Sequence, residues 1–68
     1  MKFTSDLTDK DGYCWYIEME YPIPKIGFCQ KCLYKFFDDR MTDITPYLGK
    51  YYLVGDVIQS VDDVEIGV

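Results

Sequence analysis

Residues 13–21 decide the fold of this chain, and they read Tyr13-Cys14-Trp15-Tyr16-Ile17-Glu18-Met19-Glu20-Tyr21. One set of alternate positions holds Tyr13, Trp15, Ile17, Met19 and Tyr21, and the other holds Cys14, Tyr16, Glu18 and Glu20. This period of two indicates a half-buried β-strand, because successive side chains point to opposite faces of a sheet. We therefore predict a strand over 13–21 with its Trp15 face on the core.

The residues before this stretch predict a partner strand. Residues 2–8 alternate, with Phe3, Ser5 and Leu7 on one side of the chain. Asp11-Gly12 then indicates a hairpin turn, because glycine adopts the positive φ that such turns need. We predict that 2–8 and 13–21 pair antiparallel.

The residues after this stretch predict a helix. Proline cannot donate a hydrogen bond to a strand neighbour, so Pro22-Ile23-Pro24 ends the strand, and Pro24 suits the first turn of a helix. From there, helical spacing puts six apolar residues on one stripe: Ile26, Cys29, Cys32, Leu33, Phe36 and Phe37. We predict an amphipathic helix over 25–40.

The C-terminal part predicts further strands. Pro46 and Gly49 indicate a loop over 42–50, and Gly55-Asp56 separates two β-prone runs, 51–54 and 57–61, in the pattern of a hairpin. Val64, Ile66 and Val68 alternate as in a fifth strand. The expected fold is one small α+β domain over 1–68, in β-β-α-β-β order. It has an antiparallel sheet of four to five strands and the helix on one face.

Composition narrows the function. The chain has 68 residues, which is enough for one domain with a small core. It holds no histidine, so Ser-His-Asp and Cys-His catalysis are excluded. Twelve acidic residues against seven basic ones argue against direct nucleic-acid binding, which needs clustered Lys and Arg. We expect no enzyme and no cofactor.

The cysteines and the hydropathy pattern predict a location. No apolar run follows the N-terminus, and no window is apolar enough to cross a membrane. Three cysteines without an export signal favour reduced thiols. The expected location is therefore the cytoplasm.

Cys29-Gln30-Lys31-Cys32 is a C-x-x-C motif that leaves three interpretations open. Two small thiols that pack the helix onto the sheet are the plainest. A redox dithiol needs a parallel βαβ setting that this pattern lacks. A zinc-binding accessory module organised by Cys14, Cys29 and Cys32 is the alternative function, although no histidine supplies a fourth ligand.

Acidic residues gather toward the C-terminus. After Lys50 there are four acids and no base: Asp56, Asp62, Asp63 and Glu65. Carboxylates on a rigid scaffold imitate a phosphate backbone and are attracted over long range to a basic groove. Solubility alone also explains a net charge of −5.

Twelve aromatic residues exceed what so small a core holds, and tyrosine is enriched where proteins bind one another. The candidate partner-binding residues are Tyr16, Glu18, Glu20, Tyr47, Tyr51, Tyr52, Asp56, Asp62, Asp63 and Glu65. The predicted function is a non-enzymatic module that inhibits or modulates a larger protein with a basic surface. Nucleic-acid-binding, host or defence proteins, which phage and mobile-element proteins target, fit that description. Spare aromatics and sheet edges also predict a homodimer.

Overall fold

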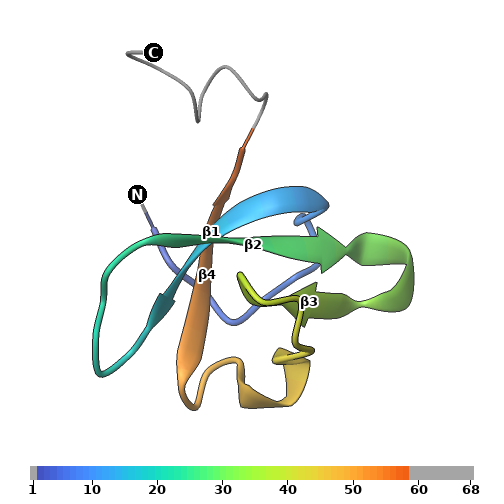
Figure 1. Ribbon diagram of the computed structural model, residues 1–68. Coiled ribbons are helices and arrows are strands. Elements are labelled where there is room, and N and C mark those ends of the chain that lie inside the picture. Colours follow the sequence, from blue (N-terminus) through green and yellow to red (C-terminus); the bar gives the residue numbers. More distant parts are fainter. Residues whose placement is uncertain (1, 59–68) are drawn as a thin grey trace.

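A four-stranded antiparallel sheet carries the fold in the computed structural model, which describes residues 2–58. The strands are β1 (Gly12–Glu18), β2 (Lys25–Gln30), β3 (Lys35–Phe37) and β4 (Tyr52–Val57), in the order β3-β2-β1-β4. Two single turns of 3-10 helix, η1 (Lys31–Leu33) and η2 (Thr45–Tyr47), lie in the connections. Figure 1 shows β2 and β4 running in clearly different directions within one sheet, so the sheet is strongly twisted.

The predicted amphipathic helix over 25–40 is wrong, and with it the α+β class. These residues form the hairpin β2-η1-β3, and no α-helix occurs within residues 2–58. The apolar positions of this region fit strands as well as a helix. In residues 26–29 and 36–37, neither the odd-numbered nor the even-numbered positions carry a polar side chain. Gly27 favours the sheet: a Cβ there would collide with the Phe37 carbonyl oxygen and the Phe36 ring. Tyr34 closes the turn in the left-handed region, with φ 52°.

The prediction that the Trp15 face of β1 packs on the core is also wrong. Cys14 and Tyr16 are the buried pair, at 0% and 2% exposure, whereas Tyr13 on the other face is 60% exposed. Residues 13–17 are apolar at every position, so alternation alone does not select a face. Leu7 and Ile44, which lie outside the strands, pack on the Cys14 side of β1. They therefore determine which face of β1 is buried.

The core is small and lies on that side of the sheet. Its seven buried residues are Leu7, Cys14, Tyr16, Cys29, Phe36, Ile44 and Val54. The rings of Tyr16 and Phe36 meet edge to face, 5.6 Å between centroids, in the arrangement that aromatic pairs prefer. Every strand contributes at least one of these residues.

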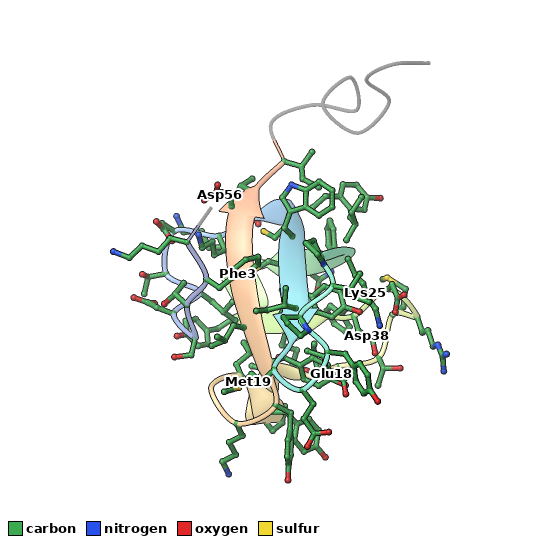
Figure 2. The ribbon with its side chains drawn as sticks, turned by 90° about the vertical axis from the view of Figure 1, so that its left-hand side faces the viewer. Phe3, Glu18, Met19, Lys25, Asp38 and Asp56 are labelled. Carbon is green, nitrogen blue, oxygen red and sulfur yellow. The ribbon has the colours of Figure 1, made fainter. Side chains whose placement is uncertain are left out.

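The two remaining hairpin predictions are corrected as well. The N-terminal segment pairs through Thr4 with Val54 of β4, by two hydrogen bonds of 2.8 Å, and not with β1. Gly55-Asp56 lies inside β4 and does not separate two strands. The register of β4 against β1 shifts at this point, between the pairs Cys14–Val57 and Tyr16–Val54. Figure 2 places Asp56 toward one end of β4 and Met19 near the other. The predicted strand over 64–68, and residues 59–61 of the run before it, lie outside the described residues.

None of the helical turns within residues 2–58 has the length and apolar character that a membrane-crossing helix needs.

Candidate protein-binding site

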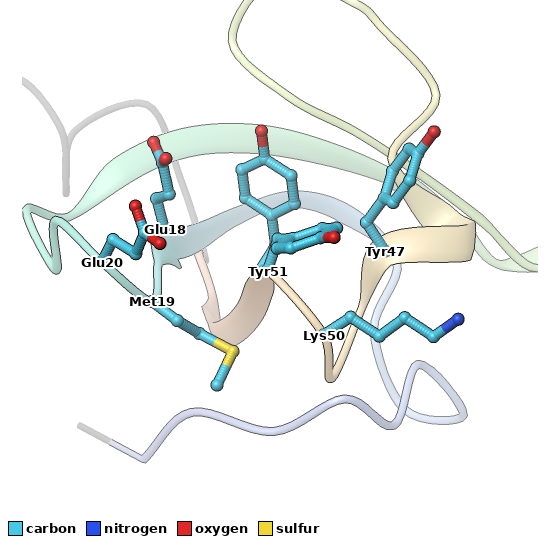
Figure 3. A pocket seen from close by; sticks show the side chains of 7 residues that line it. Glu18, Met19, Glu20, Tyr47, Lys50 and Tyr51 are labelled. Carbon is cyan, nitrogen blue, oxygen red and sulfur yellow. The ribbon is translucent and has the colours of Figure 1, made fainter.

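A hollow of about 420 Å³ opens where β1 ends and β4 begins (Figure 3). We call it the tyrosine hollow, and its lining residues are Glu18, Met19, Glu20, Tyr47, Lys50, Tyr51 and Tyr52. Glu18 and Glu20 lie to one side of Tyr51, with Tyr47 and Lys50 to the other, as Figure 3 shows. The walls therefore combine aromatic rings with charges of both signs.

Backbone hydrogen bonds hold the two sides of the hollow together. Glu18 lies opposite Tyr52 in the β1–β4 register, and the Met19 N–H donates to the Tyr51 carbonyl oxygen at 2.8 Å. The Tyr51 N–H donates to the Tyr47 carbonyl oxygen at 2.9 Å, which folds the chain back after η2. The ring centroids of Tyr47 and Tyr51 consequently lie 5.7 Å apart, and the two ring planes make an angle of 44°.

Gly49 makes this fold-back possible. Its φ is +84°, a conformation that costs glycine little and other residues more. A Cβ at this position would also lie 3.2 Å from the Ser5 Cβ, which is tight for two carbons. The turn between Tyr47 and Tyr51 therefore depends on a glycine.

The tyrosines of the hollow differ in exposure. Tyr47 and Tyr51 are 46% and 57% exposed, so their rings are available to a partner. Tyr52 is half-buried, with its ring centroid 6.0 Å from that of Tyr16. Burial and the nearby Glu18 carboxylate raise the pKa of Tyr52, so its hydroxyl stays neutral near pH 7.

The carboxylates of the hollow are not neutralised within the described part of the chain. Its two ion pairs, Lys10–Asp9 and Lys35–Asp43, are both 3.9 Å long and lie elsewhere. Glu18 and Glu20 thus present negative charge to an incoming group, and Lys50 stands across the hollow from them.

A second hollow, of about 220 Å³, adjoins the first and shares Glu18 and Tyr52 with it. The Tyr16 hydroxyl lies in its wall, donates to Asp39 Oδ1 and accepts from the Asp39 N–H, both at 3.1 Å. Burial, the largest cause, raises the pKa of Tyr16 to about 12. Lys25, Asp38 and Arg40 complete the polar rim, so this part of the surface has mixed charge.

The structure brings together half of the predicted partner-binding residues. Glu18, Glu20, Tyr47, Tyr51 and Tyr52 line the tyrosine hollow, and Tyr16 lies in the adjoining one. Asp56 is apart from them, in a separate open hollow of about 510 Å³ that also includes Asp6 and Asp9. Asp62, Asp63 and Glu65 lie outside the described residues.

Sequence reasoning missed Met19 and Lys50 as lining residues. The alternation over 13–21 predicts Met19 on the core face of a strand, but the strand ends at Glu18. Lys50 lies in the predicted loop over 42–50, whose Tyr47 is a candidate partner-binding residue, but nothing in the sequence pattern singles out Lys50 itself.

The three cysteines do not converge. Cys14 and Cys29 are buried, and Cys32 is exposed, so the expectation that Cys29 and Cys32 are both core thiols is wrong for Cys32. The Cys29 thiol donates to the Lys10 carbonyl oxygen at 3.0 Å. Burial raises the pKa of Cys14 to about 11 and also raises the pKa of Cys29, which disfavours the thiolates that zinc needs. No three potential metal ligands cluster anywhere in residues 2–58.

Comparisons with protein-family models, with curated proteins and with solved structures find no match to this chain.

Proposed function

We propose that this chain is a non-enzymatic protein-binding module, which docks its tyrosine hollow on a basic segment of a larger protein and so inhibits or modulates it. One observation carries the proposal: two exposed tyrosines and two carboxylates without ion-pair partners among residues 2–58 share the walls of one hollow.

The chemistry of these side chains suits an Arg or Lys of a partner. A cation attracts the face of a tyrosine ring, and a guanidinium also pairs with a carboxylate through two hydrogen bonds. Tyrosine buries a large area at low entropy cost, which is why it is enriched in binding hot spots. Tyr47, Tyr51, Glu18 and Glu20 supply both kinds of contact.

A phosphate-backbone mimic is less well supported than a single docking hollow. Asp56 lies at the end of β4 away from the tyrosine hollow, so the described carboxylates form separate groups. Basic residues are interspersed among them, Lys2 and Lys10 beside Asp56 and Lys25 beside Asp38.

A cytoplasmic location belongs to the same proposal, since all three thiols are free.

Affinity capture from a lysate of the native host, after nuclease treatment, tests the proposal with three versions of the chain. We expect the wild type to retain one stoichiometric partner, and the double variant Tyr47→Ala/Tyr51→Ala to lose it. Each truncated hot-spot side chain costs about 2 kcal/mol or more of binding, or roughly thirtyfold in affinity. Mass spectrometry identifies the captured protein.

Tyr34→Ala is the matched control, because Tyr34 is 52% exposed but lies at the β2–β3 turn and outside the hollow. Circular dichroism verifies that each variant is folded. If folded Tyr47→Ala/Tyr51→Ala keeps the partner as firmly as Tyr34→Ala does, the hollow is not the docking site.

A further inference from the structure

Glu18 and Tyr52 lie where the tyrosine hollow meets the smaller hollow beside it. Both residues line both hollows, so the two form one continuous groove. Glu18 and Tyr52 are directly opposite each other in the β1–β4 register, which places their Cβ atoms about 5 Å apart. A carboxylate and an aromatic ring therefore stand side by side in the middle of the groove.

The Glu18 carboxylate is half-buried, and it takes part in none of the side-chain hydrogen bonds or ion pairs found within residues 2–58. The carboxylates farther along the groove differ from it. Asp38 Oδ1 accepts two backbone N–H groups, both at 2.9 Å, and Asp39 Oδ1 accepts the Tyr16 hydroxyl at 3.1 Å. A carboxylate that loses water on binding needs a donor or a cation in exchange. Glu18 therefore has the capacity to receive a cation that Asp38 and Asp39 have already spent on the chain itself.

The ring beside Glu18 favours arginine over lysine as that cation. A guanidinium is planar, so it pairs with a carboxylate through two parallel hydrogen bonds and stacks on an aromatic ring with its face. An ammonium is a compact, strongly hydrated point charge that lacks both of these contacts. Tyr52 supplies one ring at this position, and the 57% exposed Tyr51 lies next to Glu18 in Figure 3.

Lys50 gives the groove a position of the opposite sign. It is exposed, it belongs to neither ion pair of residues 2–58, and it lies across Tyr51 from Glu18 in Figure 3. Because Lys50 is two residues before Tyr52, their Cα atoms are at most about 7 Å apart. A uniformly basic segment would bring a like charge to Lys50, which opposes binding, whereas a carboxylate would be attracted.

We propose that the segment of the partner that enters the groove is a short extended peptide with an arginine on Glu18 and an acidic residue, two positions away, on Lys50. Side chains two positions apart in an extended chain lie on the same side and about 7 Å apart, which suits the short span between the two positions in the groove. This inference rests on the proposed function, because it names the chemistry that the tyrosine hollow selects within a basic partner.

Three tripeptides with an acetylated N-terminus and an amidated C-terminus test the proposal: Arg-Gly-Glu, Lys-Gly-Glu and Arg-Gly-Gln. Each is titrated into the isotope-labelled full chain, and nuclear magnetic resonance follows the amide signals of Glu18, Tyr51 and Tyr52. Arg-Gly-Glu is expected to bind about fivefold more tightly than Lys-Gly-Glu and about threefold more tightly than Arg-Gly-Gln. Equal affinities, or no shift of these signals at millimolar peptide, would overturn the proposal.

Two variants assign each preference to its residue. Glu18→Gln is expected to erase the preference for arginine over lysine, and Lys50→Gln to erase the preference for Arg-Gly-Glu over Arg-Gly-Gln. Lys31→Gln is the matched control, since Lys31 is an exposed lysine of η1 outside the groove, and it should keep both preferences. Unchanged preferences in the folded Glu18→Gln and Lys50→Gln proteins would contradict the proposal.

The outcome is distinguishable from that of the capture experiment. If Tyr47→Ala/Tyr51→Ala loses the captured partner but the tripeptides show no preference, this inference fails and docking at the hollow stands. If the double variant keeps the partner, the proposed function fails whatever the tripeptides do.

Discussion

Gly27 is the residue on which the closeness of β2 and β3 depends. Any side chain there would enter the space of the Phe37 carbonyl oxygen and the Phe36 ring, and the carbonyl belongs to the backbone. We expect Gly27→Ala to destabilise the protein by about 1–3 kcal/mol, the usual cost of overpacking a core. Urea unfolding followed by circular dichroism measures the change.

Lys31→Ala serves as the control for Gly27, because Lys31 is exposed in η1. Its free energy of unfolding is expected to stay within about 0.5 kcal/mol of the wild type. An equally stable Gly27→Ala protein would show that β2 and β3 do not approach each other as described.

At the scale of elements, the sequence predicts that β1 exists, but neither its end at Glu18 nor its buried face, and it predicts the region 25–40 wrongly. Residues 13–18 follow a run of turn residues and hold Trp and Tyr, so a strand is favoured there by composition as well as by period. In 25–40, apolar residues occupy so many positions that both a helical stripe and two short strands fit them. Gly27 and the left-handed Tyr34 decide for strands, but their roles depend on contacts that the sequence does not display.

The residues of the candidate site were partly predictable from the sequence, but their arrangement in space was not. The chain has more aromatic residues than its core can hold, so some of its tyrosines must lie near the surface. Together with the acidic residues, this surplus gave the candidates Glu18, Glu20, Tyr47, Tyr51 and Tyr52. Their meeting in one hollow follows from the β1–β4 register and the turn at Gly49. Those are long-range features, so neither the hollow nor Lys50's part in it was visible in the pattern.

The hairpin itself is testable at Tyr34, where hairpin and helix predict opposite signs. Tyr34 has φ 52° and ψ 47°, which costs a non-glycine residue about 1 kcal/mol or more. Tyr34→Gly is therefore expected to leave stability unchanged or raise it by up to about 1 kcal/mol, after the entropy cost of glycine. Inside a helix, the same substitution would lower stability by about 1 kcal/mol.

Thermal unfolding measures this sign, and Tyr34→Val provides the comparison. A β-branched residue is poorly tolerated in the left-handed region, so Tyr34→Val is expected to be less stable than Tyr34→Gly. The reverse order would favour the helix and contradict the hairpin.

Across the whole molecule, the distribution of charge allows long-range attraction of a partner to be distinguished from direct contact with it. All seven basic residues and nine of the twelve acidic ones lie within 1–58, so the last ten residues carry three acids and no base. Charges outside a contact act mainly on the rate of association and are screened beyond about 8 Å at physiological ionic strength. Charges within a contact act on dissociation.

If the tyrosine hollow is the docking site, the two groups of carboxylates affect different rate constants for the captured partner. Neutralising the C-terminal group, by Asp62→Asn/Asp63→Asn/Glu65→Gln, is expected to slow association up to about tenfold and to weaken its dependence on salt. Neutralising Glu18 and Glu20 is expected instead to speed dissociation, because those carboxylates line the hollow. Surface plasmon resonance over a range of salt concentrations measures both rates. Faster dissociation from the C-terminal variant, with Glu18→Gln/Glu20→Gln unchanged, would move the contact to the acidic C-terminal residues and favour the phosphate-mimic form of binding over the hollow.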